Sequence, residues 1–291
     1  MPELVSYVVE SNTGLICIDH PPVNALSQPI RQGLADALMA LTATPEAQII
    51  ILYCAGRTFI AGADINEFDQ TPRPPLLGTV LDLLDNMTKP VIAAIHGTAL
   101  GGGLETALAC HYRCAVASAK IGLPEVKLGI LPGAGGTQRL PRLAGVEQAL
   151  KMIVSGNPIA ATQAHQHGII DELIEGDLLT GARAYAQRLL ASNAPLRRAR
   201  DLLVTAPSTG YFDEFRRAIA KQTRGFYAPE RCIQCIEAAV SLSFDDGLKH
   251  ERKLFEECKQ TIHSKAQRYL FFAERAANKM PMVNKKTPRR Q

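Results

Sequence analysis

Apolar and polar positions along the first 120 residues follow two alternating patterns. Compact runs of aliphatic and β-branched residues, typical of strands, occupy residues 4–9, 15–18, 48–53, 90–95 and 113–117. Between the later runs, apolar residues recur every three or four positions at residues 30–41, 77–87 and 101–110, which predicts helices. The first two runs flank a turn and predict a hairpin. The alternation that follows predicts an α/β fold whose parallel strands are joined by helical crossovers.

From about residue 145 the pattern becomes mostly helical. Apolar residues at three- and four-residue intervals predict helices at 149–154, 160–167, 178–191, 196–203, 211–223, 232–240 and 244–276. Because no second strand–helix alternation appears, we expect this half to cover the first rather than to form another sheet. We therefore divide the chain into a core at residues 1–190, a helical region at 191–279 and a basic tail at 280–291, which we expect to be disordered.

Composition and charge narrow the class of protein. The 291 residues are 46% hydrophobic and 21% charged, a balance typical of a folded globular protein. The formal net charge is +4, but Lys285, Lys286, Arg289 and Arg290 supply four positive charges near the C-terminus, so the rest of the chain is near neutral. We therefore expect no nucleic-acid partner, although a basic tail could contact an acidic surface.

The sequence carries no signal for export or membrane insertion. Its N-terminus lacks a basic start followed by an apolar run, and nowhere do 18 apolar residues follow one another. The seven cysteines are odd in number and scattered, which suits a reducing compartment. These features predict a soluble, cytoplasmic protein that does not bind a membrane.

One cysteine pair requires a separate interpretation. Cys232 and Cys235 form a CxxC, with His250, Cys258 and His263 as conceivable zinc partners downstream. A structural zinc site needs a second closely spaced pair of ligands, and this spacing fits no common site. We therefore favour buried thiols on a helix and expect no metal.

Three glycine-rich segments carry the candidate chemistry, at residues 55–65, 97–105 and 122–137. Glycines let a ligand approach the backbone closely and leave amide N–H groups free to donate. If a helix starts in the second segment, the amides of Gly102 and Gly103 are among its unpaired N-terminal donors, at the positive end of the helix dipole. This arrangement predicts an anion site.

Two carboxylates accompany these amides. Glu105 lies three residues beyond Gly102, so one helical turn can present an oxyanion donor and a carboxylate together. Glu125 follows Pro124 in the third segment, whose glycines and prolines predict a long loop. Taken singly, Glu105 could merely stabilise the helix dipole, and Glu125 could be a surface residue. Together, two carboxylates and two sets of free amides are what hydration of an α,β-unsaturated thioester requires.

The combined motifs resemble those of the enoyl-CoA hydratase/isomerase (crotonase) family over roughly residues 5–190. The matching motifs are Ala61-Gly62-Ala63-Asp64, Ala99-Leu100-Gly101-Gly102-Gly103-x-Glu105, Pro124-Glu125-x-x-Leu128-Gly129 and Pro132-Gly133-x-Gly135-Gly136-Thr137-Gln138-Arg139-Leu140. The resemblance implies a crotonase-like spiral of ββα units, within the α/β class, followed by a helical C-terminal region.

The resemblance also implies roles for individual residues. The amides of Ala63 and Gly102 would form an oxyanion hole for the thioester carbonyl. Glu105 and Glu125 would share the catalytic water, with Glu105 as the base on that water and Glu125 delivering a proton to the α-carbon. The amide of Gly133 would help to hold the water.

The substrate implied by the resemblance is an acyl-CoA thioester. The backbone around Ala61 and Ile65 would meet the adenine end of coenzyme A. No metal or redox cofactor is implied, because coenzyme A enters as part of the substrate. Trimers are common in the family, so the resemblance is compatible with a homo-oligomer.

The C-terminal third is similar to part of a longer kind of protein. Residues 244–248 and 264–275 resemble the end of the hydratase half of multifunctional fatty-acid oxidation proteins, in which a nicotinamide-dependent 3-hydroxyacyl-CoA dehydrogenase follows. No strand followed by GxGxxG occurs after residue 275, and Gln138 occupies the last glycine position of an earlier partial match. We therefore expect no NAD binding.

These observations predict an enoyl-CoA hydratase that converts medium or long trans-2-enoyl-CoA to 3-hydroxyacyl-CoA in fatty-acid β-oxidation. The nearest alternative is a Δ3,Δ2-enoyl-CoA isomerase, which needs the same oxyanion hole and one carboxylate. The presence of Glu105 as well as Glu125 favours hydration. An alternative of another class is a non-catalytic acyl-CoA binding module, which would bind without turnover.

Overall fold

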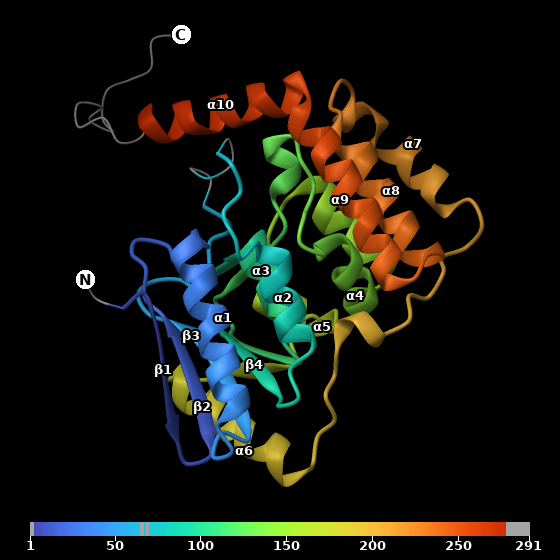
Figure 1. Cartoon of the computed structure of the whole chain (residues 1–291). Coiled ribbons are helices and arrows are strands. Elements are labelled where there is room, and N and C mark those ends of the chain that lie inside the picture. The colour runs from blue at the N-terminus through green and yellow to red at the C-terminus, as the bar shows by residue number, and fades with distance from the viewer. Residues whose placement is uncertain (1–2, 65–66, 68–69, 278–291) are drawn as a thin grey trace.

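The computed structural model describes residues 3–64, 67 and 70–277 as a large sheet and a small sheet surrounded by helices (Figure 1). The large sheet contains β1 Val5–Glu10, β2 Thr13–Ile18, β3 Ile49–Cys54, β4 Val91–Ile95, β6 Tyr112–Val116 and β9 Glu172–Ile174, in the order β1-β2-β3-β4-β6-β9. β1 and β2 form the predicted antiparallel hairpin, and every later pair of neighbours is parallel. The small sheet contains β5 Thr98–Leu100, β7 Lys120–Gly122 and β8 Ile159–Ala160, in the order β5-β7-β8.

Helices connect the parallel strands, as the alternating pattern predicts. The α-helices are α1 Gln28–Ala43, α2 Leu77–Asp85, α3 Gly102–Ala109, α4 Gly136–Ser155, α5 Ala161–Gln166, α6 Leu178–Ala191, α7 Tyr211–Thr223, α8 Ala228–Ser241, α9 Phe244–Gln260 and α10 Ile262–Ala277, with short 3-10 helices η2 Glu125–Leu128 and η3 Ala199–Asp201. α1 joins β2 to β3, and α2 joins β3 to β4. β5 and α3 lie between β4 and β6, and this connection carries the glycine-rich segment with Glu105.

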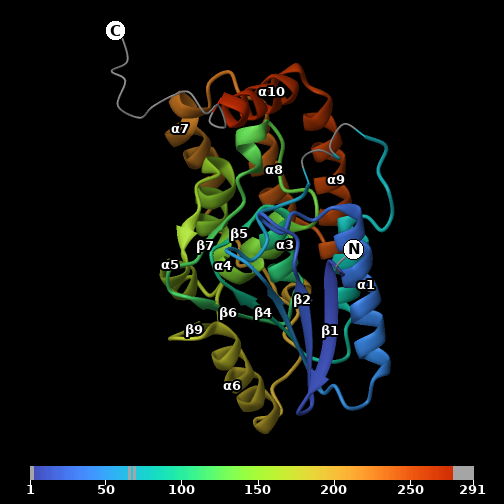
Figure 2. The ribbon, with the colours of Figure 1, turned by 90° about the vertical axis from the view of Figure 1, so that its left-hand side faces the viewer.

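Both faces of the large sheet are covered, which explains the continuous apolar runs of its central strands. In β3, Ile50 and Leu52 belong to the core on the side of α1 and α2. Ile49 and Ile51 belong to a second core that includes Tyr185 of α6. Figure 2 shows α6 beneath the sheet, away from α1.

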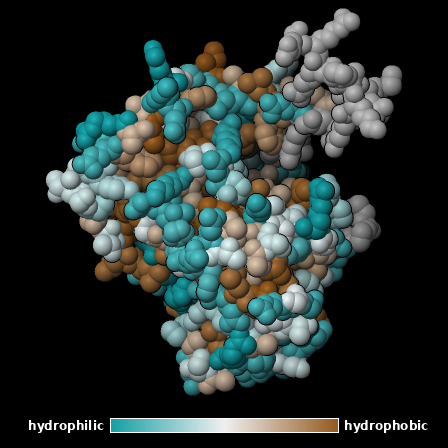
Figure 3. Space-filling model, turned by 180° about the vertical axis from the view of Figure 1, so that it is seen from behind, coloured by the Kyte–Doolittle hydropathy of each residue, from teal (hydrophilic) through white to brown (hydrophobic). Residues whose placement is uncertain are grey.

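The C-terminal helices pack against one another and against α4. α8 packs against α4, and α9 packs against both α4 and α8 (Figures 1 and 2). α10 leaves α9 and packs against η2, next to Glu125. From behind, the surface mixes hydrophilic and hydrophobic side chains in small areas (Figure 3), as is usual for a folded domain.

The second half also contributes strands, which corrects the expectation that it would only cover the first half. β9 extends the large sheet by pairing with β6, and β8 pairs with β7 in the small sheet. These strands have three and two residues, too few to show an alternating pattern in the sequence.

Two predicted helices differ from the observed ones. Residues 196–203 contain only η3, and Arg198 ties this segment to the end of α2 by donating to the carbonyl of Asp85 at 2.6 Å. The single helix predicted at 244–276 is two helices, because Thr261 adopts an extended conformation. The Thr261 hydroxyl accepts a hydrogen bond from Ser264 N at 3.1 Å and so starts α10. The proposed division at residue 190 stays a prediction, and the tail at 280–291 lies outside the described residues.

Candidate active site

The N-terminus of α3 packs directly against the first glycine-rich segment. Gly101 has φ +53° and donates its N–H to the carbonyl of Gly122 at 2.9 Å, an arrangement that links β5 to β7. A side chain at Gly103 would overlap the carbonyl of Ile60. Glycine at this position therefore lets the start of α3 approach the backbone of the first segment.

This close approach brings two backbone amides together. A Cβ atom built on Gly102 would lie 3.4 Å from Ala63 N. Ala63 is held by its parallel bridge to Leu26, whose N–H donates to the carbonyl of Gly62 at 3.0 Å. Among the described residues, neither the Ala63 amide nor the Gly102 amide donates to a protein acceptor. The structure thus places side by side the two donors predicted from sequence for an oxyanion hole.

Glu105, in the first turn of α3, is buried with only 3% of its surface exposed. Its Oε1 accepts hydrogen bonds from Ala134 N at 2.8 Å and Gly136 N at 2.9 Å. Burial raises the pKa of this carboxyl, and the two amide donors lower it in part. The side chain is therefore fixed by the third glycine-rich segment, not by solvent.

Glu125 opens η2, a short helix where the sequence predicted only loop. A Cβ built on Gly101 would lie 3.0 Å from Glu125 Oε1, so the carboxyl faces the start of α3. Its Oε2 is buried and, within the described part of the chain, has no hydrogen-bond partner. Burial and then the charge of Glu105 raise the pKa of Glu125 well above its usual range.

The different surroundings of the two carboxyls favour different protonation states. An ionised carboxylate is stabilised by amide donors, and Glu105 has two of them. Glu125 is half-buried, and its buried Oε2 has no such donor within the described part of the chain, which favours its neutral form. The pair can therefore hold one carboxylate and one carboxylic acid, the combination that general acid–base chemistry requires.

A third buried carboxyl, Glu251 of α9, completes the cluster and was not predicted from sequence. Its side chain accepts hydrogen bonds from Gly135 N, Thr137 N and Thr137 Oγ1 at 2.7, 3.0 and 2.5 Å. Burial and then the charge of Glu105 raise its pKa to about 8. The buried residues of α9 are Phe244, Gly247, Glu251, Leu254 and Cys258. A charged residue on this otherwise uncharged face, spaced by three and four, is a signal that could have revealed it.

The other predicted site residues lie in the same region or outside the described chain. Ala61 is half-buried and donates its N–H to the carbonyl of Val23 at 3.1 Å. Gly133 lies under the Phe255 ring of α9, where a built Cβ would come within 2.6 Å of the ring. Glu105 accepts from Ala134 and Gly136, whereas the role of Gly133 in holding water stays a prediction. Ile65 lies outside the described residues.

Other candidate groups have structural surroundings. His111 is buried, its Nδ1 accepts from Val91 N at 3.1 Å, and burial lowers its pKa to about 4. Cys232 and Cys235 are buried free thiols on α8. Across residues 3–64, 67 and 70–277, no group of three or more His, Cys, Asp or Glu side chains is arranged to hold a metal ion. No helix in that part of the chain is long and apolar enough to cross a membrane.

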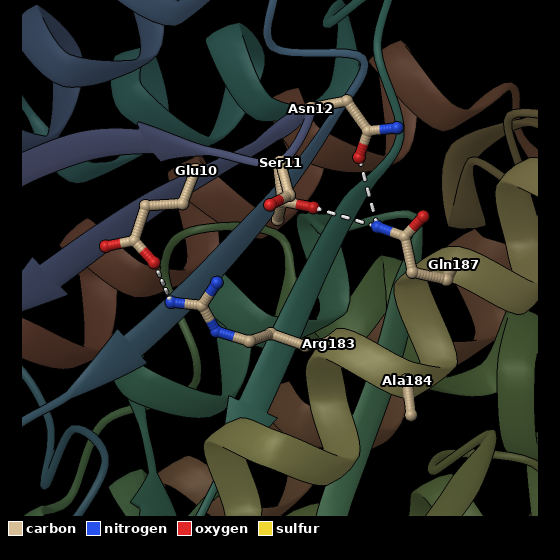
Figure 4. A pocket seen from close by; sticks show the side chains of 7 residues that line it. Glu10, Ser11, Asn12, Arg183, Ala184 and Gln187 are labelled. Atoms are coloured by element: carbon tan, nitrogen blue, oxygen red, sulfur yellow. Dashed lines mark hydrogen bonds and ion pairs between the residues drawn. The ribbon is translucent and has the colours of Figure 1, made fainter.

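A shallow pocket elsewhere belongs to the packing of α6 against the hairpin (Figure 4). Glu10 pairs with Arg183 at 2.6 Å, and Gln187 donates to Asn12 at 3.0 Å. None of the residues lining this pocket belongs to the cluster of Glu105, Glu125 and Glu251. It does not contribute to the candidate active site.

Comparison with known proteins finds relatives along nearly the whole chain. The human peroxisomal bifunctional enzyme is 42% identical over 271 residues, which cover 91% of this chain and 37% of the relative. The peroxisomal fatty acid beta-oxidation multifunctional protein AIM1 of Arabidopsis thaliana is 35% identical over 293 residues, covering 95% and 40%. The chain thus spans well under half the length of these relatives. In structure, carnitinyl-CoA hydratase from Mycobacterium avium matches 94% of this chain and 97% of its own, with 27% identity and a TM-score of 0.69.

These relatives correct one prediction. The expected cytoplasmic location is contradicted, because the human and Arabidopsis thaliana relatives are both named as peroxisomal proteins. Neither the absence of an export signal nor the reduced state of the cysteines distinguishes the cytoplasm from such an organelle.

The family model described as enoyl-CoA hydratase/isomerase matches residues 9–228, which include every predicted site residue. The match confirms the predicted crotonase fold, the resemblance to the hydratase half of multifunctional proteins, and, at the level of the family, an enzyme of the enoyl-CoA hydratase type. With both glutamates and both free amides inside the matched region, the chain belongs to the enoyl-CoA hydratase/isomerase family.

Proposed function

We propose that this chain hydrates trans-2-enoyl-CoA to 3-hydroxyacyl-CoA in fatty-acid β-oxidation. One observation carries the proposal: the buried Glu105 and the half-buried Glu125, whose carboxyls have unlike surroundings, lie beside two unoccupied backbone donors. Hydration needs a base for water, an acid for the α-carbon and donors for the charge that develops on the thioester oxygen. The site contains a group suited to each task.

The geometry supports a division of labour between these groups. The thioester oxygen would accept from Ala63 N and Gly102 N as negative charge develops on it. Glu105, stabilised as a carboxylate, would take a proton from water as the water oxygen attacks the β-carbon. Glu125 would give its proton to the α-carbon. The net reaction adds one water without oxidation or reduction, so we propose no redox cofactor and no resident metal.

Isomerisation remains the nearest alternative, and one observation separates it from hydration. A proton shuttle from one carbon to another needs a single carboxyl group, which Glu125 could supply. Two amides hold Glu105 in the same site, where a shuttle would have no use for it. A binding module would have no use for either carboxyl, and burying both costs free energy.

The absorbance of the conjugated thioester distinguishes these activities. We expect the band of crotonyl-CoA and of a C10 trans-2-enoyl-CoA to disappear when the protein is added, because water addition removes the double bond. Appearance of the band from a 3-enoyl-CoA, with no loss from the 2-enoyl substrates, would indicate an isomerase instead. If the absorbance changes with none of the three substrates, the non-catalytic acyl-CoA binding module is the remaining alternative.

Narrowing the proposed oxyanion hole should impair the reaction without unfolding the protein. In Gly102→Ala, the new methyl group would meet the flexible end of Leu77 at 2.9 Å and lie 3.4 Å from both Ala63 N and Leu26 Cδ1. We expect kcat/KM for crotonyl-CoA to fall about 100-fold, the scale for losing one oxyanion donor. Gly78→Ala on α2 is the matched control, because its methyl would meet no atom within 4 Å. Equal kcat/KM values for the two variants would refute this assignment.

Several wider properties are proposed from the relatives and the family. We propose a peroxisomal location, since the human and Arabidopsis thaliana relatives are named as peroxisomal proteins. We also propose that Ala61 and Ile65 contact the adenine end of coenzyme A, that the Gly133 amide helps to hold the water, and that the chain forms a homo-oligomer. Size-exclusion chromatography with light scattering tests the last of these.

A further inference from the structure

The loop that holds Glu105 is itself held from two sides. Residues 133–137 span the end of the connection from η2 to α4 and the first two residues of α4, and four successive backbone amides in this stretch donate alternately to different carboxyls. Ala134 N and Gly136 N donate to Glu105 of α3, whereas Gly135 N and Thr137 N donate to Glu251 of α9. Because neighbouring peptide units donate to different carboxyls, neither can rotate without breaking a hydrogen bond to a buried carboxyl.

The cation Arg139 restrains the same loop. It donates to the carbonyl of Ala134 at 2.9 Å and forms a buried ion pair with Asp85 of α2. Gly135 has φ +96°, and a side chain there would overlap the guanidinium of Arg139. The loop backbone is thus fixed by three ionisable side chains, from α3, α4 and α9.

Within the described part of the chain, the hydrogen bonds that the Glu251 side chain accepts all come from this loop. Glu251 is 1% exposed, and its three donors are Gly135 N, Thr137 N and Thr137 Oγ1. α9 approaches α4 so closely that a side chain at Gly247 would overlap the side-chain amide oxygen of Gln138. An apolar residue would fill this face of α9 at lower cost, because a buried carboxyl loses its hydration. Unlike an apolar side chain, the carboxyl accepts hydrogen bonds and so fixes the orientation of the loop amides.

We propose that Glu251 is a positioning residue that acts through Glu105, by fixing residues 134–137 so that two amides point at the Glu105 carboxylate. The inference rests on the proposed hydratase function, in which Glu105 is the base on water. Glu251 does not touch the reacting atoms in this account. Its effect on the reaction is therefore expected to disappear when Glu105 can no longer act as a base.

A double-mutant cycle tests this dependence. In Glu251→Gln, the amide oxygen can still accept from Gly135 N and the amide nitrogen can donate to Thr137 Oγ1, but Thr137 N loses its acceptor. We expect kcat for crotonyl-CoA to fall about 10- to 100-fold with little change in KM, as for a misplaced catalytic group. In a Glu105→Gln background, the same change should lower kcat less than about twofold, because coupled residues are not additive. Glu256→Gln is the control and should leave kcat unchanged, because Glu256 is a partly exposed glutamate on the same helix that pairs with Arg252.

Hydrogen exchange gives a readout that does not depend on activity. In the unsubstituted protein the amides of 134–137 should exchange slowly. In Glu251→Gln, exchange should become faster at Ala134 and Gly136 as well as at Thr137, since the backbone of residues 134–137 is no longer held in one orientation. If the wild-type chain hydrates no substrate, the proposed function fails, and this comparison still decides whether Glu251 fixes the loop.

Two results would overturn the inference. One is an equal loss of kcat from Glu251→Gln in both backgrounds, which is the signature of a purely structural effect. The other is unchanged exchange at Ala134 and Gly136. Should Glu251→Gln fail to fold, Thr137→Val removes one donor to Glu251 and keeps the amide N–H; it should show the same dependence on Glu105, with a smaller loss.

Discussion

Replacing Glu125 by glutamine should lower the rate of hydration by about two to four orders of magnitude, the usual scale for removing a general acid or base. Glutamine has nearly the same shape but cannot deliver a proton to the α-carbon. Burial without a partner at Oε2 and the nearby charge of Glu105 favour the protonated form of Glu125. The loss should therefore appear in kcat, with KM for crotonyl-CoA close to that of the unsubstituted enzyme.

The measurement is the initial rate of loss of the conjugated absorbance at saturating substrate. Glu147→Gln is the control, because Glu147 lies on the surface in an ion pair with Lys151. Thermal unfolding of both variants shows whether the protein remains folded. A near-normal rate for Glu125→Gln would remove this residue from the mechanism and leave no acid for the α-carbon.

Replacing Glu105 by glutamine should cause a loss of similar size for a different reason. The amide oxygen of glutamine can still accept from Ala134 N and Gly136 N, so the loop should stay in place. Glutamine cannot take a proton from water, however, and the rate should fall by about two to four orders of magnitude. Removing the charge of Glu105 also removes a cause of the raised pKa of Glu125, so Glu125 should ionise at lower pH than before.

Steady-state kinetics across a pH series checks both parts of this prediction. The fall in kcat should persist at every pH, since the glutamine side chain cannot take a proton from water at any of them. Glu147→Gln again serves as the control for loss of a surface carboxylate. A Glu105→Gln variant that hydrates crotonyl-CoA at more than about a tenth of the normal rate would mean that water is activated elsewhere.

Much of the core could be predicted from sequence because its signals are local. The apolar run Ile49–Cys54 is buried on both faces of the sheet, and the glycines before Glu105 lie where α3 meets the backbone of residues 60–63. These features depend on residues that are close together in the chain, or on one close contact between two backbone segments. The motifs around Glu105 and Glu125 are therefore sufficient to indicate the candidate site from the sequence.

The features that were missed depend on contacts between distant parts of the chain. Glu251 belongs to no motif, and its partners Gly135 and Thr137 lie more than 100 residues earlier in the sequence. The two-residue strand β8 forms only because β7 is beside it. The break at Thr261 rests on one hydroxyl, and threonine at that position produces no periodic signal.

The packing of the C-terminal helices has a consequence for function. α9 supplies Glu251 to the loop that holds Glu105, and α10 packs against η2, where Ser264 Oγ donates to the carbonyl of Leu128 at 3.2 Å. The segments carrying both glutamates are therefore supported by helices that follow the sheet in sequence. The helical region is part of the site and not only a cover for the core.

The most direct test of the central claim is the mass of the product formed from a C10 trans-2-enoyl-CoA in water labelled with oxygen-18. If Glu105 and Glu125 add water across the double bond, the unsubstituted enzyme should give a product heavier by one labelled water, and the Glu105→Gln/Glu125→Gln double variant should give almost none. A product of unchanged mass, or full labelling by the double variant, would contradict the account.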